Sequence, residues 1–188
     1  MNKKEITKIL KKELDKNRFV HTLGVAYTAS CLAMKYSFDV DKAYMAGLLH
    51  DCAKGMSDKE RLEYCKSNSI EITSVEMENP SLLHAKAGAF MANNRFEIDD
   101  KEICDAICYH TTGKPKMSLF EMIIFVADYI EPNREHDPEL PDIRKEAFEN
   151  IEKATLHIYK NTLEYLSKST KALDPTTKEA YLYYSEIV

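Results

Sequence analysis

The residues of this chain that could do chemistry are histidines and aspartates placed on or at the ends of apolar segments. His50 and Asp51 stand side by side after the apolar run 47–49. Two such groups are costly to bury unless something compensates for them, and a cation bound by both would do so. Four other residues are able to complete a site of this kind: His21, His84, His110 and Asp128.

Asp128 is the most informative of these residues because it follows the apolar run 122–127. A buried carboxylate without a partner is strongly destabilising. An exposed aspartate in a last helical turn is the alternative, but the helix dipole disfavours negative charge there. We therefore interpret Asp128 as a metal ligand. Taken singly, the histidines allow simpler interpretations, as exposed polar residues or as a cation at a helix end.

Taken together, these side chains predict a divalent metal site. Two histidines and two aspartates suit Fe²⁺, Mn²⁺ or Co²⁺ with open positions left for water. A structural zinc site would be expected to use thiolates. The two further histidines could hold a second ion, with Asp51 bridging, or contact a phosphate directly. Two metals about 4 Å apart would clamp the attacking and leaving oxygens of a displacement at phosphorus.

Composition and charge narrow the class of protein. The 188 residues suit one well-buried domain, and 5 Gly with 6 Pro argue against a turn-rich all-β fold. Hydrophobic content of 44% and charged content of 30% carry no signature of disorder. The net charge of −5 predicts no binding to duplex nucleic acid or to an anionic membrane, whereas a small polyanionic substrate stays compatible with a local metal.

The chain carries no sign of a membrane span or of secretion. No apolar stretch approaches about 20 residues, and the first residues lack the apolar region of a signal peptide. The five cysteines include no Cys-x-x-Cys pair, which is typical of reduced thiols in a cytoplasmic protein. Cys104 and Cys108 lie one helical turn apart, but we interpret them as core residues rather than as ligands.

Hydrophobic periodicity predicts helices throughout the chain, without repeats or linkers. Ser57 and Ser118 each precede a Glu by three residues, the pattern of a capping box that opens a helix. Asp41 is the expected N-cap of the third helix, and 68–80 is expected to be a loop. The expected helices are 6–14, 19–36 with His21 in its first turn, 42–52, one opened by Ser57, 81–91, 101–110, 119–129, 143–148, 151–167 and one that begins at Pro175.

The order His21, His50-Asp51, Asp128 resembles the H…HD…D signature of the HD-domain metal-dependent phosphohydrolase superfamily. The surrounding segments resemble one bacterial family, the symmetrical bis(5′-nucleosyl)-tetraphosphatases of HD type. These segments are LLHDCAK at 48–54, HAKAG at 84–88, ICYHTTG at 107–113 and ADYIEPNR at 127–134. The resemblance is clear over roughly 19–134 and looser over 173–181, where Tyr181 and the next residue, Leu182, replace an expected Arg and Asn.

The resemblance implies an all-α, single-domain HD-type helical bundle over 1–188, with a core at about 18–134 and C-terminal helices 142–188 packed on it. It implies an enzyme that cuts diadenosine tetraphosphate into two ADP by attack of a metal-activated water. It implies one or two iron ions, with Mn or Co as substitutes. The expected partners are a dinucleoside polyphosphate or ADP, and the chain could form a homodimer.

The resemblance also assigns roles to individual residues. The metal ligands are His21, His50, Asp51 and Asp128, with His84 and His110 on a second metal or on the phosphate. The expected catalytic residues are Asp51, His84 and His110. Substrate is expected to contact His84, His110, Lys54, Thr111, Arg134, Pro175 and Thr177.

Several alternatives stay open at this point. Lys54 could be an exposed helix-end lysine, and Arg134 could pair locally with Glu131. The activity could be that of another HD phosphohydrolase, such as a deoxynucleoside 5′-monophosphatase or a cyclic-nucleotide phosphodiesterase. A non-catalytic nucleotide sensor is the rival from another class, although an intact ligand set argues against it.

Overall fold

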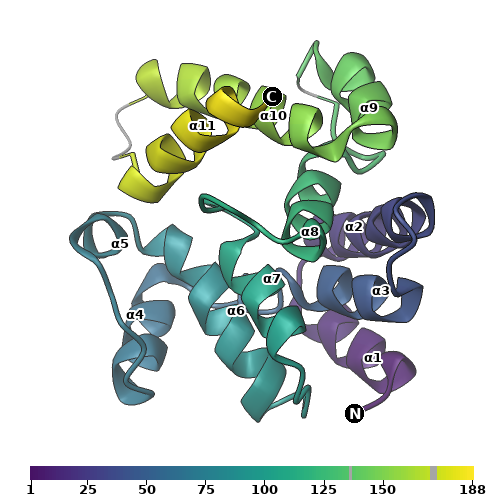
Figure 1. Ribbon diagram of the computed structural model, residues 1–188. Coiled ribbons are helices and arrows are strands. Elements are labelled where there is room, and N and C mark those ends of the chain that lie inside the picture. Colours follow the sequence, from purple (N-terminus) through teal and green to yellow (C-terminus); the bar gives the residue numbers. More distant parts are fainter. Residues whose placement is uncertain (136, 170–172) are drawn as a thin grey trace.

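The structure, a computed structural model, describes residues 1–135, 137–169 and 173–188. Every regular element in that part of the chain is a helix (Figure 1), as predicted. The elements in chain order are α1 Lys3–Glu13, α2 Lys16–Lys35, α3 Val40–Leu49, α4 Asp58–Ser67, α5 Ser74–Glu78, the 3₁₀ turn η1 Pro80–Leu82, α6 Leu83–Asn94, α7 Lys101–Tyr109, α8 Leu119–Ile130, α9 Leu140–Glu149, α10 Ile151–Ser167 and α11 Pro175–Ile187.

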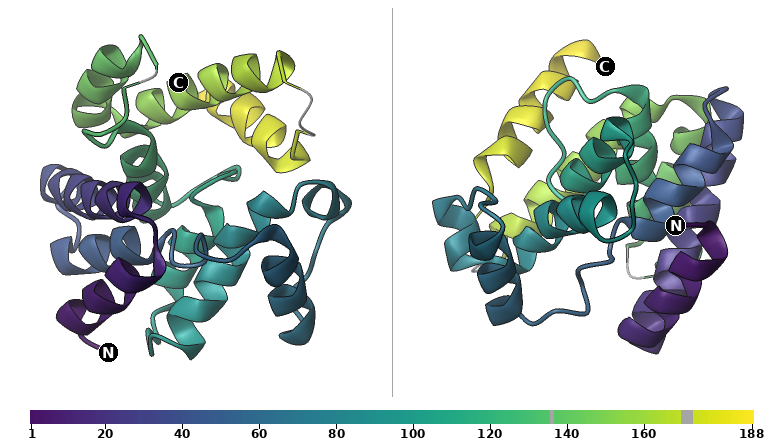
Figure 2. Two further views of the ribbon diagram at one scale, coloured as in Figure 1. Left: turned by 180° about the vertical axis from the view of Figure 1, so that it is seen from behind. Right: turned by 90° about the horizontal axis from the view of Figure 1, so that it is seen from below.

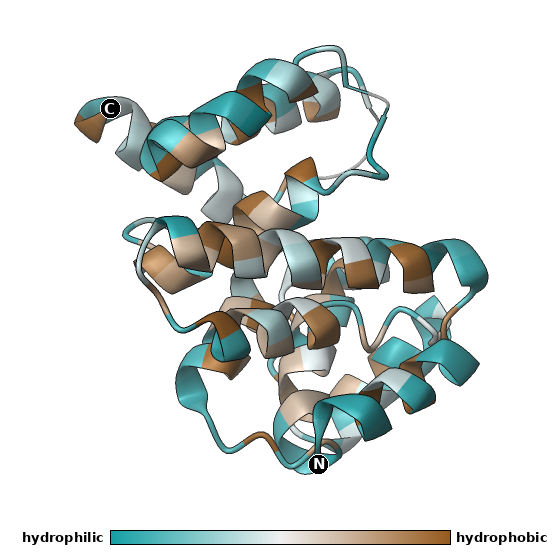
Figure 3. Cartoon of the chain, turned by 90° about the vertical axis from the view of Figure 1, so that its right-hand side faces the viewer, coloured by the Kyte–Doolittle hydropathy of each residue, from teal (hydrophilic) through white to brown (hydrophobic). Residues whose placement is uncertain are grey.

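Helix α8 is the central element. It packs against α2, α3 and α7 on one side and against α9 and α10 on the other (Figures 1 and 2). All residues from Met122 to Ala127 are buried, which explains why this stretch is continuously apolar rather than amphipathic. Other helices alternate hydrophilic and hydrophobic residues along their length (Figure 3) because one face of each packs inward. Among the described residues, none of the helices combines the length and apolarity needed to span a bilayer.

The capping boxes predicted at Ser57 and Ser118 are confirmed. At the start of α8, Glu121 N donates to Ser118 Oγ over 3.2 Å, and Ser118 N donates to Glu121 Oε2 over 2.7 Å. Two free backbone donors are thereby satisfied at the first turn. The capping box fixes where α8 begins, and therefore places Asp128 in the last turn of this helix.

A close approach between α2 and α3 sets the distance between the elements that carry His21 and His50. A Cβ at Gly47 would lie only 2.8 Å from Ala26 Cα, so only glycine fits at this crossing. Ala26 is itself fully buried. Small residues on both helices let the two backbones nearly touch, which brings the ends of α2 and α3 within side-chain reach of each other.

The turn after α7 rests on the C-terminal helices. Gly113 has a φ of +60°, in the left-handed region that favours glycine, and a Cβ there would overlap the hydroxyl of Tyr159 from α10. Met117 N donates to the hydroxyl of Tyr184 from α11 over 3.1 Å. The segment that follows His110 therefore packs against α10 and α11.

Some predicted boundaries were wrong. The segment 68–80, expected to be a loop, contains α5 with a capping box between Thr73 and Glu76. A helix of five residues is too short to show a hydrophobic period, so only its cap could have indicated it. Asp39 rather than Asp41 caps α3, and α3 ends at Leu49 with His50 as its C-cap.

Helix α2 begins three residues earlier than predicted, at Lys16 after the N-cap Asp15. His21 therefore lies in the second turn rather than in the first. Helix α9 also begins earlier, at Leu140. Lysine, asparagine and arginine at 16–18 hide the start of α2 from a hydrophobic period, since this turn is largely exposed.

Candidate metal centre

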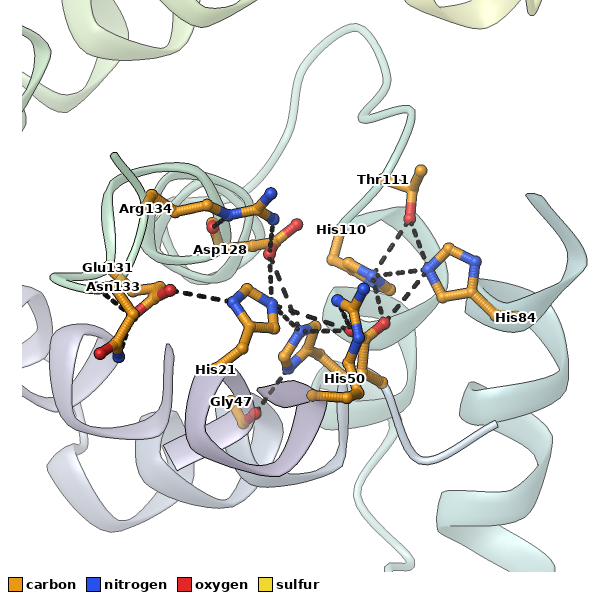
Figure 4. A network of polar contacts seen from close by, with 12 residues as sticks. His21, Gly47, His50, His84, His110, Thr111, Asp128, Glu131, Asn133 and Arg134 are labelled. Atoms are coloured by element: carbon orange, nitrogen blue, oxygen red, sulfur yellow. Dashed lines mark hydrogen bonds and ion pairs between the residues drawn. The ribbon is translucent and has the colours of Figure 1, made fainter. Parts of the chain in front are cut away.

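The six predicted metal-capable residues converge on one place in the structure, called here the HD cluster (Figure 4). They are His21, His50, Asp51, His84, His110 and Asp128. They come from five helices or helix ends: α2, the C-terminus of α3, α6, the C-terminus of α7, and α8. The three side chains of His50, Asp51 and His110 are at most 2% exposed. Asp128 points toward the histidines rather than into solvent, and its side chain is 21% exposed. The spatial convergence expected from the sequence is thus present.

The first part of the cluster, called here the His21 group, consists of His21, His50, Asp128 and Asp51 Oδ2. His21 Nε2 lies 3.0 Å from Asp128 Oδ1 and 3.3 Å from His50 Nε2. His50 Nε2 lies 3.3 Å from Asp51 Oδ2 and 3.8 Å from Asp128 Oδ1. Two imidazoles and two carboxylates therefore face a common centre.

The second part, called here the His84 group, consists of His84, His110 and Asp51 Oδ1. The two Nε2 atoms are 3.1 Å apart, and Asp51 Oδ1 lies 3.4 Å from His84 and 3.7 Å from His110. Thr111 Oγ1 lies 3.1 Å from both Nε2 atoms. Asp51 thus joins the two groups, with one carboxylate oxygen directed at each.

The orientation of the imidazoles follows from their other nitrogen. Nδ1 of His50, His84 and His110 each contacts the backbone carbonyl three residues earlier, at 2.7, 2.5 and 2.7 Å. A carbonyl oxygen only accepts, so Nδ1 carries the proton and Nε2 presents a lone pair. His21 differs, because its Nδ1 lies 3.1 Å from the carboxylate of Glu131.

This donor set fits a divalent cation. The Nε2 lone pairs of His84 and His110 face each other, which is unfavourable unless a cation lies between them. Asp51 Oδ1 is buried and has no hydrogen-bond partner among the described residues. Ions of this class bind nitrogen at about 2.0–2.1 Å, so two ligands of one ion lie within ~4.2 Å of each other. The separations within each group meet that limit.

Comparisons with known proteins agree with this geometry. The sequence pattern of the HD domain family, described as "HD domain", matches residues 18–133. The chain is 36% identical over its whole length to the symmetrical bis(5′-nucleosyl)-tetraphosphatase of Bacillus subtilis and covers 98% of that protein. It is 32% identical to the enzyme of the same name from Staphylococcus aureus, over 98% of this chain and 95% of that protein.

The chain belongs to the HD-domain family of symmetrical bis(5′-nucleosyl)-tetraphosphatases. A crystal structure from Clostridium acetobutylicum, described as that of a "predicted HD superfamily hydrolase involved in NAD metabolism", is 39% identical. It superposes with a TM-score of 0.96 over 100% of this chain and 99% of that one. The HD-type helical fold predicted from the sequence is therefore confirmed.

The electrostatics of the HD cluster keep its carboxylates ionised. Burial alone would raise the pKa of Asp51, but the adjacent His50, His110 and His84 hold it well below its usual value. Burial would likewise raise the pKa of Asp128, but the hydrogen bond with His21 and the charge of Arg134 keep it well below the usual value. Both aspartates are thus available as anionic ligands.

The histidines respond differently to their surroundings. Burial lowers the pKa of His84 well below its ordinary value, so this imidazole is neutral at pH 7. Burial also acts to lower the pKa of His21, but Asp128 and Glu131 on its two nitrogens raise it overall. A carboxylate on each side favours positive charge at His21, which a metal ion at Nε2 would supply.

Two of the predicted cationic substrate contacts border the HD cluster. Arg134 Nη2 donates to Asp128 Oδ1 over 2.9 Å, and Arg134 Nε donates to the Asp128 carbonyl over 3.2 Å. The local alternative, an ion pair with Glu131, is therefore not the arrangement found. Lys54 is half-buried in the turn after Asp51 rather than exposed at a helix end, and burial lowers its pKa.

Two charged residues of the site were missed by sequence reasoning. Arg18 Nη1 donates to Asp51 Oδ2 over 2.7 Å. Its spacing of three from His21 places both on one face of α2, and that spacing was an available signal. Glu131, noted in the sequence only as a local partner for Arg134, contacts His21 across 110 positions. No local pattern predicts such a contact.

The predicted C-terminal contacts lie beside the cluster. Neither Pro175 nor Thr177 hydrogen-bonds any of the six residues within the described chain; Thr177 Oγ1 instead donates to the Thr112 carbonyl over 3.3 Å. A cavity of about 240 Å³ separates α5, α6 and the end of α7 from the start of α11, and Thr112 and Pro175 are among its lining residues. Of the cysteines considered as ligands, Cys104 and Cys108 are half-buried and belong to neither metal-capable group.

Proposed function

We propose that this chain is a metal-dependent hydrolase that cleaves diadenosine tetraphosphate symmetrically into two ADP. The observation that carries the proposal is the arrangement around Asp51, whose two oxygens each face a pair of imidazoles. Full-length relatives with the symmetrical tetraphosphatase name support the substrate class. A dinucleoside polyphosphate or ADP is the proposed partner, the cytoplasm the proposed compartment, and a homodimer the proposed assembly.

The metal would be held by the residues predicted from the sequence. His21, His50, Asp51 Oδ2 and Asp128 would hold one ion, and Asp51 Oδ1, His84 and His110 would hold a second. The mixture of imidazoles and carboxylates, without a thiolate, supports iron with Mn or Co as substitutes. Bound ions of this kind lower the pKa of a coordinated water from ~15.7 to ~7 and neutralise charge on phosphoryl oxygens.

The side chains around the cluster suit a polyanion despite the net charge of −5. Arg18 and Arg134 each present a guanidinium that is already hydrogen-bonded to a ligand carboxylate, and such a fork can bind phosphate oxygens bidentately. Lys54 adds a half-buried positive charge beside Asp51. Thr111 offers a hydroxyl at the His84 group. Asp51 or one of the neighbouring histidines would take up the proton released from the attacking water.

The cavity beside the cluster supports a symmetrical cut. It has a volume of about 240 Å³, lies between α5 and the turn at Pro175, and is lined by Thr112, the residue after Thr111. A nucleoside there would place the first phosphates of an ADP-sized half toward Thr111 and the HD cluster. Cleavage at the far side of that half leaves ADP on both sides of the broken bond.

The rival activities make different demands on substrate. A nucleoside monophosphatase or a cyclic-nucleotide phosphodiesterase would act on a substrate with a single phosphate, and a sensor would bind without turnover. None of these activities is supported by the full-length relatives. Profiling metal-loaded protein with diadenosine tetraphosphate, a deoxynucleoside monophosphate and a cyclic nucleotide distinguishes them.

The deciding experiment is chromatography of a diadenosine tetraphosphate digest made by anaerobically purified protein, with elemental analysis of the same sample. We expect ADP alone among the products, and iron among the bound elements. Formation of AMP with ATP would contradict the symmetrical cut. Asp128→Ala should remove hydrolysis, whereas Asp105→Ala, which breaks only a surface pair with Lys101, should retain it.

A further inference from the structure

One histidine of the HD cluster is oriented by a different kind of group from the other three. His50, His84 and His110 direct Nδ1 at a backbone carbonyl of their own helix, so the helix itself fixes their orientation. His21 directs Nδ1 at Glu131 Oε1 over 3.1 Å instead. The orientation of His21 thus depends on a side chain from the far end of another helix.

Glu131 is held rigidly at the C-terminus of α8. Its side chain is 1% exposed, and its Oε2 accepts hydrogen bonds from Asn133 N and Asn133 Nδ2, both at 2.8 Å. Arg144 from α9 donates to the Glu131 carbonyl over 3.0 Å. One carboxylate oxygen is thereby saturated, and the other is left to face His21. A buried carboxylate with this set of partners has one orientation.

Space for this carboxylate is provided by Gly24, one turn after His21 on α2. A Cβ at Gly24 would overlap Glu131 Oε2 and would lie 3.0 Å from its Cδ and 3.1 Å from Asn133 Nδ2. Gly24 lies within α2, where glycine is unfavourable relative to alanine by about 1 kcal/mol. The contact with Glu131 explains why a glycine is present at this position.

We propose that Glu131 is a positioning residue that keeps His21 protonated at Nδ1 and directs the Nε2 lone pair into the His21 group, and that Gly24 makes room for it. A carboxylate accepts hydrogen bonds only, so it selects the Nδ1–H form and increases the basicity of Nε2. Asp128 and Glu131 then contact opposite nitrogens of one imidazole. The inference rests on the proposed metal centre.

The variant Glu131→Gln tests this selection directly. An amide has a single acceptor oxygen, and Asn133 offers two donors to it whereas His21 offers one. The oxygen should therefore turn to Asn133 and the NH₂ group to His21 Nδ1. A donor facing Nδ1 forces the proton onto Nε2, which removes the lone pair that a metal needs.

The experiment measures the tautomer and the metal affinity separately from activity. In the metal-free full chain Asp128 also accepts from Nε2. Imidazole ¹⁵N NMR should therefore find a proton on His21 Nδ1 in the wild type, and a proton on Nε2 alone in Glu131→Gln. Titration calorimetry with Mn²⁺ should find affinity lowered about 10- to 100-fold, the usual effect of an outer-shell partner, with kcat lowered more than KM is raised. Wild-type affinity and an Nδ1–H His21 in the variant would overturn the proposal.

A matched control is Glu121→Gln, which alters a buried glutamate at the opposite end of α8. Glu121 caps that helix and pairs with Lys114, so its loss should lower the melting temperature while metal affinity stays at the wild-type value. If Glu121→Gln weakened Mn²⁺ binding as much as Glu131→Gln does, the effect would be one of stability and the proposal would fail.

Gly24→Ala provides a second and independent test. The added methyl should displace the Glu131 carboxylate and weaken Mn²⁺ binding, and its effect should largely disappear when Glu131 is already Gln. Additive effects of the two changes would contradict the proposal. If the wild type bound Mn²⁺ but left diadenosine tetraphosphate intact, the proposed substrate would be wrong, whereas the tautomer and affinity results would still decide the role of Glu131.

Discussion

The His21 group and the His84 group share Asp51 and each contain two imidazoles, but they differ in the carboxylates around them. The His21 group contains a second metal-capable carboxylate, Asp128, and is backed by the carboxylate of Glu131. The His84 group contains no second carboxylate, and its imidazoles are backed by main-chain carbonyls with Thr111 in front. The His21 group therefore has more negative charge, and a divalent ion should bind there more tightly.

This difference predicts stepwise loading of the HD centre. A tight ion would occupy the His21 group first, and a weaker one would complete the His84 group. Both arginines also lie at the His21 group. Arg134 contacts Asp128, and Arg18 contacts the Asp51 oxygen that faces the His21 group. Positive and negative side chains are thus concentrated at the His21 group, whereas the His84 group beyond Asp51 is largely neutral.

The largest expected effect comes from the residue that joins the two halves. Asp51→Asn replaces one anionic oxygen by an NH₂ group and should weaken metal binding at both groups. We expect diadenosine tetraphosphate hydrolysis to fall by more than about 10⁴-fold, beyond the range of a single acid–base group. Product chromatography measures the loss of hydrolysis, and elemental analysis measures the loss of bound metal. Retention of two metal equivalents would contradict the bridging role.

The next largest effect distinguishes the His84 group from the His21 group. His84→Ala should abolish the weaker of two Mn²⁺ binding events and lower kcat by about 10²- to 10⁴-fold. His21→Ala should instead abolish the tighter event. Titration calorimetry on each variant reads out the difference. Loss of the tighter event in His84→Ala would reverse the order of the two groups.

A smaller effect is expected from the arginines at the charged half. Arg18→Met and Arg134→Met each remove a charge-assisted hydrogen bond to phosphate, worth about 1.5–3 kcal/mol, so KM should rise about 10- to 100-fold. Steady-state kinetics at saturating Mn²⁺ measures this change. The variant Arg95→Met, which removes a pair with Glu13 and a cation–π contact with Phe96 outside the site, is the control. An unchanged KM for both site variants would place the phosphates at the His84 group alone.

The smallest effect comes from a histidine that repeats the two-carboxylate pairing of His21 away from the HD cluster. His157 Nδ1 lies 2.9 Å from Glu146 and Nε2 lies 3.2 Å from Glu139. Burial acts to lower the pKa of His157, but these glutamates raise it overall. Its stabilising contribution is therefore complete below the ordinary histidine pKa and lost as the pH rises through the raised value.

Urea denaturation of His157→Gln measures that contribution. The variant should be less stable than the wild type by about 0.5 kcal/mol at pH 5.5, as for a partly exposed ion pair, and equal to it at pH 9. A larger loss at pH 9 than at pH 5.5 would have the wrong sign for this pairing. We expect the two carboxylates around His157 to act on stability alone, because His157 belongs to neither metal-capable group in the described part of the chain.

The convergence of the six residues could be predicted from the sequence because each stands where an apolar run makes a polar side chain costly. Asp128 after a buried helical run and His50-Asp51 after another are signals of that kind. The all-α fold was predictable for a related reason, since the capping boxes at Ser57 and Ser118 and the hydrophobic period agree. These signals lie within single helices, and the structure confirms the helices that they predict.

What could not be predicted depends on contacts between distant segments. Glu131 and His21 lie 110 positions apart, and Arg18 reaches Asp51 across 33. Glu131 follows α8 in a polar stretch that reads as a helix end, so its burial becomes visible only when α2 and α9 pack around it. Helix α5 was not predicted for a different, local reason, because five residues are too few to show a hydrophobic period.

The contacts between the turn after α7 and the helices α10 and α11 have a consequence for protein engineering. A fragment ending at residue 133 would keep all six metal-capable side chains and the stretch matched by the HD family. It would lose Tyr159 and Tyr184, on which Gly113 and Met117 rest. Shortened versions of this protein would therefore retain the six metal-capable residues but lose the packing that orders the turn carrying Thr111. Crystallisation or display work should keep α10 and α11.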